Sequence, residues 1–132
     1  MIDYSNEIFN DVATVLRNAV EGITVVGEYV QSPTSFPTVT IDEISNVPKH
    51  RDSAKTEKYA TLQYRVQVFS NKSIGKRVEA RNILNVVATR LTELGFERKT
   101  YTTTPDVYNS SVYQITATFD AVIDAEGVIY KN

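Results

Sequence analysis

The sequence predicts an α+β domain, because two adjacent segments carry opposite hydrophobic periodicities. Between residues 59 and 69, apolar and polar side chains alternate with a period of two, which is typical of a half-buried strand. Between residues 79 and 94, apolar side chains recur every three or four positions and form one stripe of a helix. Each segment therefore has an apolar face that the other can cover. The strand face comprises Ala60, Leu62, Tyr64, Val66 and Val68, and the helix stripe comprises Ala80, Ile83, Leu84, Val87, Leu91 and Leu94.

The remaining elements follow in order along the chain. Helical spacing of apolar residues predicts a first helix over 5–20, and β-branched residues predict strands over 23–30 and 38–44. A second long alternating segment over 112–123 matches the strand over 59–69, and residues 96–104 form a further strand candidate. This order predicts a mainly antiparallel sheet of four to five strands with two helices packed on one face. We expect one core that contains Leu62, Val66, Ile83, Val87, Leu91, Ile115 and Phe119.

Composition limits the range of functions. The chain has 132 residues, 42% of them hydrophobic, and suits a single domain over 1–132. Its formal net charge of −2 gives no overall positive field, so we expect no sequence-specific binding of nucleic acid. The chain has no cysteine, no signal-peptide pattern and no apolar run near the roughly 18 residues that a membrane span needs. We therefore expect a soluble, unexported protein that has no membrane partner.

A polar segment over 45–58 is the main candidate for a binding surface. It lacks apolar periodicity, and it joins two predicted strands. Its length exceeds that of a tight hairpin turn. Connections longer than roughly 12 residues are uncommon in compact domains unless they are mobile or engage something. The candidate contact residues in this segment are Lys49, His50, Arg51, Lys55 and Lys58.

Tyrosine is the other unusual feature, with eight copies in the chain. Several fall late in the sequence, and tyrosine is enriched at interfaces because its ring is apolar while its hydroxyl is polar. The alternative is that these tyrosines belong to the core or its rim. Residues 124–132 form a short C-terminal tail that is apolar enough to dock on a neighbour. The tyrosines proposed for an interface are Tyr101, Tyr108 and Tyr130.

No recognisable catalytic, cofactor or metal motif is present. His50 is the single histidine, and no carboxylate pair or second ligand of its kind accompanies it. Asp42 and Glu43 are adjacent in a predicted strand, so their side chains point to opposite faces and cannot form one acid/base site. Residues 73–77 resemble a phosphate loop only superficially, since the spaced glycines are missing. We expect no enzymatic activity, no cofactor and no bound metal.

The order of elements and several short runs resemble one protein family across nearly the whole chain. These runs are 36–46 (FPTVTIDEISN), the strand end 64–71 (YRVQVFSN), Glu79-Ala80-Arg81, Leu94-Gly95-Phe96 and 113–117 (YQITA). In this order they resemble the small tail-terminator or tail-completion proteins in the neck of tailed bacteriophages and prophages.

The resemblance implies a structural virion protein without catalytic residues. Copies of such a protein form a ring, with a hexamer as the expected form, that caps the tail tube and joins the tail to the head connector. The implied partners are further copies of the chain, the tail tube protein and a head-completion or connector protein, and DNA could pass through the ring lumen. The implied location is the tail or neck of the virion after assembly in the host cytoplasm. The alternatives are another neck component, such as a head-completion or adaptor protein, or a small ligand-binding domain or enzyme.

Overall fold

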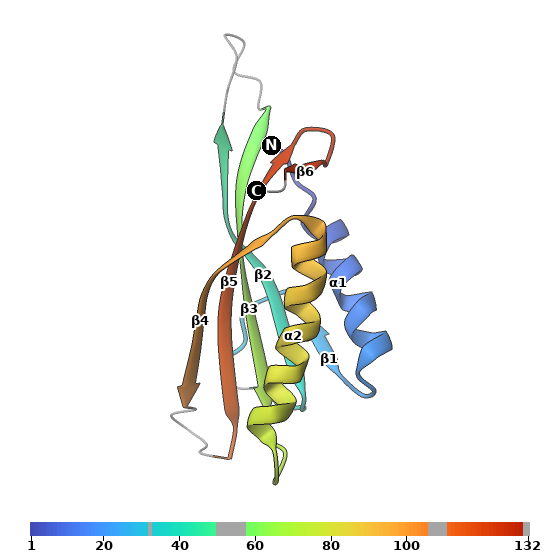
Figure 1. Ribbon diagram of the computed structural model, residues 1–132, viewed down its shortest axis with the longest axis vertical. Coiled ribbons are helices and arrows are strands. Elements are labelled where there is room, and N and C mark those ends of the chain that lie inside the picture. Colours follow the sequence, from blue (N-terminus) through green and yellow to red (C-terminus); the bar gives the residue numbers. More distant parts are fainter. Residues whose placement is uncertain (32, 50–57, 106–110, 131–132) are drawn as a thin grey trace.

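Two helices pack against one face of a six-stranded sheet (Figure 1). The computed structural model describes residues 1–31, 33–49, 58–105 and 111–130. The predicted α+β class is confirmed, although the sheet has six strands instead of four to five. In chain order the elements are α1 (Ser5–Ala19), β1 (Thr24–Val26), β2 (Thr38–Lys49), β3 (Tyr59–Ser70), α2 (Lys76–Leu94), β4 (Glu97–Pro105), β5 (Tyr113–Asp124) and β6 (Ile129–Tyr130).

The sheet is built around β3 and β5, which pair antiparallel from Tyr59 opposite Asp124 to Ser70 opposite Tyr113. The strand order is β1-β2-β3-β5-β4. β6 pairs with the same side of β5 as β4, beyond the first residue of β4. Only the short β1 runs parallel to its neighbour, β2, among the described pairs. This order leaves β4 as a long outer strand at one edge of the sheet.

The helices and one sheet face share a single hydrophobic core. The alternating apolar residues of β3 and β5 point to the same side because directly paired residues of neighbouring strands share a face. α2 crosses this side, and α1 packs against α2 (Figure 1). The expected core residues are all buried in this cluster, which confirms the assignment of the helix and strand faces: Leu62, Val66, Ile83, Val87, Leu91, Ile115 and Phe119.

The opposite sheet face is partly covered by the segment that follows β1. Gln67 lies on this face and is buried; its Oε1 accepts hydrogen bonds from Thr40 Oγ1 at 2.8 Å and from the Val30 N–H at 3.5 Å. Arg65 lies over the Tyr29 ring, 4.8 Å from its centroid. A predicted strand over 23–30 is therefore wrong beyond its first residues, because the chain leaves the sheet edge after β1 and crosses the sheet.

The predicted polar loop is shorter than 45–58, because residues 45–49 belong to β2. A bulge at Glu43/Ser45 shifts the register, and β2 then continues along β3 until Lys49 lies opposite Tyr59. Pro48 is compatible with this position because no strand pairs with the outer side of β2 beyond Thr40 in the part of the chain that is described. Long-range pairing with β3 thus outweighs the loop-like composition of this segment.

The described part of the predicted C-terminal tail, residues 124–130, forms a hairpin with β5 instead; residues 131–132 lie outside the described part. After a turn at residues 125–128 the chain reverses, and β6 pairs with β5 at Val122 and Ile123. The Tyr4 hydroxyl donates a hydrogen bond to the Ala125 carbonyl at 3.0 Å, which joins this hairpin to the N-terminal segment. Within the described residues, neither helix is long and apolar enough to cross a membrane.

Candidate assembly interface

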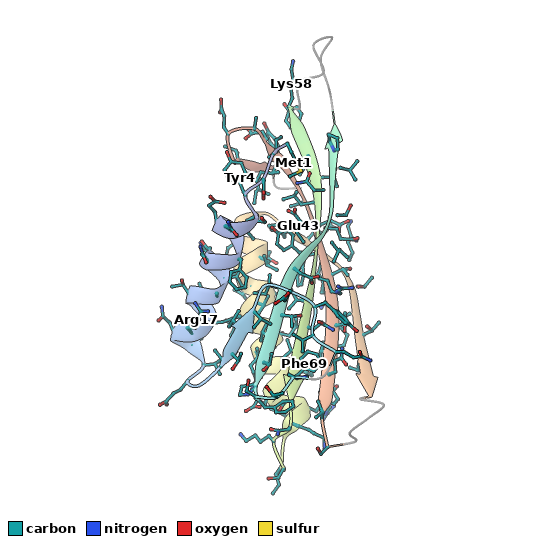
Figure 2. The ribbon with its side chains drawn as sticks, turned by 180° about the vertical axis from the view of Figure 1, so that it is seen from behind. Met1, Tyr4, Arg17, Glu43, Lys58 and Phe69 are labelled. Atoms are coloured by element: carbon teal, nitrogen blue, oxygen red, sulfur yellow. The ribbon has the colours of Figure 1, made fainter. Side chains whose placement is uncertain are left out.

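Half of the residues predicted to contact a partner lie outside the described part of the chain. His50, Arg51, Lys55 and Tyr108 are in the undescribed ranges, and Lys49 is described only by its backbone at the end of β2. Lys58 is exposed immediately before β3, at one end of the long sheet axis (Figure 2). Its carbonyl accepts a hydrogen bond from the Ala125 N–H at 3.2 Å. The structure therefore places Lys58 beside the β5–β6 hairpin, and its role in binding stays a prediction.

Tyr130 belongs to a small polar and aromatic cluster on the β5–β6 hairpin. Its ring lies against Tyr59, with centroids 5.5 Å apart, and its hydroxyl donates to Asp124 Oδ2 at 3.2 Å. The Asp124 Oδ1 accepts the N–H groups of Glu126 and Val128, each at 2.9 Å. These backbone bonds, that of Val128 most, lower the pKa of Asp124, while the neighbouring Tyr59 hydroxyl and the carboxylate raise the pKa of Tyr130 to about 12. The cluster keeps the turn in one conformation.

Tyr101 lies on the opposite face of the sheet from Tyr130. It pairs with Ala117 on the helix side of the sheet and is half buried. The guanidinium carbons of Arg81 and Arg98 lie 5.6 and 6.0 Å from its ring centroid. The two tyrosines therefore do not form one surface. Tyr101 packs against the hydrophobic core of its own chain, and its role at an interface stays a prediction.

The outer strand β4 forms an edge of the sheet, and its Thr100 and Thr102 side chains lie on the face away from the helices. Thr100 and Thr118 lie opposite each other with their hydroxyls 2.7 Å apart, and Thr102 Oγ1 donates to the Thr116 carbonyl at 3.3 Å. Edge strands present backbone N–H and C=O groups that can pair with another chain. β4 is thus able to add a strand from a partner, although nothing in its side chains selects one.

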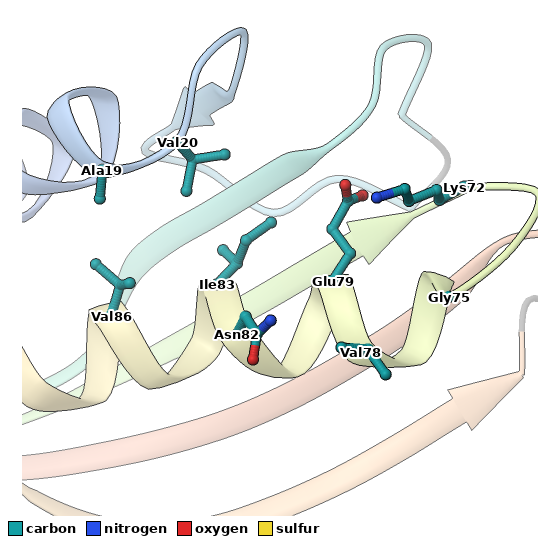
Figure 3. A pocket seen from close by; sticks show the side chains of 9 residues that line it. All are labelled: Ala19, Val20, Lys72, Gly75, Val78, Glu79, Asn82, Ile83 and Val86. Carbon is teal, nitrogen blue, oxygen red and sulfur yellow. The ribbon is translucent and has the colours of Figure 1, made fainter.

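An apolar groove of about 530 Å³ lies between the end of α1 and the first turns of α2 (Figure 3). α1 stops at Ala19, so it covers only the later part of α2. The open part is lined mainly by apolar side chains, with Lys72 and Glu79 at one end, where they point toward one another in Figure 3. The lining residues are Ala19, Val20, Lys72, Gly75, Val78, Glu79, Asn82, Ile83 and Val86.

The groove was not predicted, although the sequence contains a signal for it. Val78 and Val86 are eight residues apart on α2 and fall outside the stripe that faces the sheet. Two apolar positions on a second side of a helix indicate a second contact surface. That α1 leaves Val78 exposed depends on where α1 ends against α2, which the sequence does not express.

A smaller cavity of about 270 Å³ contains the candidate carboxylate Glu43 beside Tyr64. As expected, Asp42 and Glu43 point to opposite faces: Asp42 Oδ2 accepts a hydrogen bond from Arg65 Nη2 at 3.0 Å, and Glu43 faces the helices. Burial raises the pKa of Glu43, and the Tyr64 hydroxyl and Asn46 oppose this rise. Among the described residues no group of three or more His, Cys, Asp or Glu side chains could hold a metal ion. The cavity lining therefore contains one carboxyl group, together with the hydroxyl groups of Ser5 and Tyr64.

Comparison with known proteins identifies a structural neighbour. No family model matches the sequence, and no curated protein does. A chain in the solved structure of the virion of a native gene transfer agent particle superposes with a TM-score of 0.56. The match covers 92% of this chain and 94% of that chain at 10% sequence identity. At this identity the match shows a shared fold over almost the whole length of both chains.

Proposed function

We propose that this protein is a structural component of a phage-like virion. The observation that carries the proposal is the fold shared with a chain of a gene transfer agent virion over almost the full length of both proteins. We also propose that the protein has no catalytic activity, because the larger groove is mainly apolar and the lining of the Glu43 cavity contains a single carboxyl group.

Within the virion, the role we propose is that of a tail terminator. Its copies form a ring, expected to be a hexamer, which caps the tail tube and joins it to the head connector. The family resemblance of the sequence supports this role, and so do the exposed edge strand β4 and the β2–β3 hairpin that extends from the sheet. Both features offer surfaces to neighbouring copies and to the tube. Such a role needs no catalytic residue or cofactor.

The mass of the purified protein tests the ring. Native mass spectrometry should show a closed oligomer, either alone or after addition of purified tail tube protein. Electron microscopy of the mixture should show this oligomer at one end of each tube. A protein that stays monomeric both alone and in assembled particles contradicts the ring.

The phenotype of a deletion separates the terminator from another neck component. Loss of a tail cap should give tubes of uncontrolled length. Loss of a head-completion or adaptor protein should instead leave tubes of normal length that do not attach to heads. Tubes of normal length in the deletion strain would therefore favour the second role.

A further inference from the structure

The large apolar side chains that are exposed in the described residues gather mainly at two ends of the molecule. Ile74 and Val78 are 85% and 54% exposed at the start of α2, beside the groove. Val128 and Tyr130 are 52% and 45% exposed on the β5–β6 hairpin. Figure 1 places the start of α2 and this hairpin at opposite ends of the long axis. Two separate apolar surfaces at opposite ends suit a contact that repeats from one copy to the next.

The two segments that form these surfaces also differ in charge. Residues 71–79 contain the cations Lys72, Lys76 and Arg77 and a single carboxylate, Glu79, whose Oε1 already accepts a hydrogen bond from Ser70 Oγ at 2.7 Å. The N-terminal end of the α2 dipole adds positive potential at the same place. Residues 124–128, which we call the acidic turn, contain two carboxylates and no cation. Lys58 lies beside this hairpin, so the charge complementarity is between the acidic turn itself and residues 71–79.

The acidic turn has the shape and rigidity of a docking element. The Asp124 side chain accepts two backbone N–H groups of the turn, and the Gly127 N–H donates to the Asp124 carbonyl at 3.1 Å. The Tyr4 ring lies against Gly127 and supports the turn. The exposed Val128 and Glu126 thus stand on a turn that is already ordered, so little conformational entropy is lost when it binds.

We propose that the acidic turn of one copy docks in the apolar groove of the next copy. Val128 enters the groove beside Val78 and Val86, and Glu126 meets Lys72 at its end. This inference rests on the proposed ring, and it names the surfaces that join its subunits. The contact uses two different surfaces, so it is heterologous and closes into a ring when the rotation between successive copies allows it.

Engineered disulfides test the contact directly, because the chain has no cysteine that could react instead. The double variant Val78→Cys, Val128→Cys should form covalent dimers and higher multimers under oxidation, which disappear on reduction. Each single variant should form at most dimers. A matched control pairs Val128→Cys with Thr92→Cys, an exposed position near the other end of α2, and should give no covalent ladder.

Charge reversal provides a second measurement. Lys72→Glu and Glu126→Lys should each weaken self-association on the order of tenfold, by equilibrium sedimentation, and the two changes together should restore part of the loss. Val78→Asp places a charge in the groove and should also weaken self-association. Asn85→Asp, at an exposed position elsewhere on α2, is its control. Circular dichroism checks that every variant is folded.

The outcomes separate this inference from the proposed function. Rings of unchanged stability in folded Val78→Asp and Lys72→Glu variants, without a disulfide ladder in the double cysteine variant, overturn the docking of the turn in the groove and leave the ring intact. A wild-type protein that is monomeric alone and in particles overturns both.

Discussion

Gly127 occupies a position where a side chain would meet two separate obstacles. Its φ of +86° lies in the left-handed region, and an added Cβ would lie 2.9 Å from the Tyr4 ring. Gly75 has a similar φ of +84°, but nothing lies within 4 Å of its Cβ position. Gly75 therefore offers a control that contains the backbone strain without the steric clash.

We expect Gly127→Ala to lower the free energy of unfolding by more than Gly75→Ala does. Backbone strain alone costs about 1 to 2 kcal/mol in each variant. Displacement of Tyr4 adds the loss of its hydrogen bond to Ala125, about 1 kcal/mol more. Urea unfolding measures both. Equal losses in the two variants would show that Tyr4 moves aside at no cost.

Glu43 is the residue for which the structure predicts an unusual pH dependence. Its pKa is raised by burial, so the folded protein binds this proton more tightly than the unfolded chain does. The free energy of unfolding therefore falls as the pH rises from the ordinary value of the carboxyl through its raised value. This stabilising contribution is present at low pH and lost above the raised pKa.

The variant Glu43→Gln removes this titration. Relative to the wild type, this variant should be more stable at about pH 7 than at about pH 4. Urea unfolding at both pH values measures the two differences in the free energy of unfolding. Glu21→Gln, at an exposed position, makes the same change in formal charge and serves as the control. A difference between Glu43→Gln and wild type that does not change with pH would contradict the proposed burial of the charged group.

At the scale of elements, the core between α2 and the sheet determines stability. Leu91 is fully buried on α2, where it belongs to the same cluster as the apolar faces of β3 and β5. Leu91→Ala should lower the free energy of unfolding by about 2 to 5 kcal/mol, because it removes buried methyl groups and leaves a cavity. The exposed neighbour Thr92→Ala should change it little. A thermal midpoint that matches the wild type would mean that this helix face is not buried.

The β2–β3 hairpin allows a test of the connecting segment. Pairing continues to Lys49 opposite Tyr59, so a short Gly/Ser turn can replace residues 50–57 without disturbing the ladder. No residue of the described core is removed, and circular dichroism should match the wild type. Ring formation or tail completion should be impaired if this segment contacts a neighbour or the tube. Wild-type assembly by the variant would remove the segment from the mechanism.

At the scale of the whole molecule, the proposed contact between the acidic turn and the basic start of α2 predicts an association that depends on salt. Raising the ionic strength from about 0.05 M to about 0.5 M shortens the screening length severalfold and should weaken the contact between Glu126 and Lys72. Sedimentation at both concentrations measures this. The Lys72→Glu variant should show a smaller salt dependence than the wild type. An association that strengthens with salt would indicate that apolar burial dominates the interface.

The sequence by itself determined the α+β class, the long strands and second helix, and the core residues that they share. These features are local, because an apolar face repeats within one element at the period of a strand or a helix. Leu62, Ile83 and Phe119 could be assigned to one core in this way. The chemistry of the candidate surfaces could be read only as residue types, such as basic or tyrosine-rich segments.

Tertiary structure alone decided where the elements end and which residues meet. β2 extends to Lys49 because β3 supplies a pairing partner, although Ser45, Asn46 and Pro48 have the composition of a loop. Tyr101 and Tyr130 lie on opposite faces because β4 and β6 pair with the same edge of β5 in different registers. The groove exists because α1 ends before it covers Val78. Each of these outcomes depends on pairing or packing between residues far apart in the chain, which a local pattern does not contain.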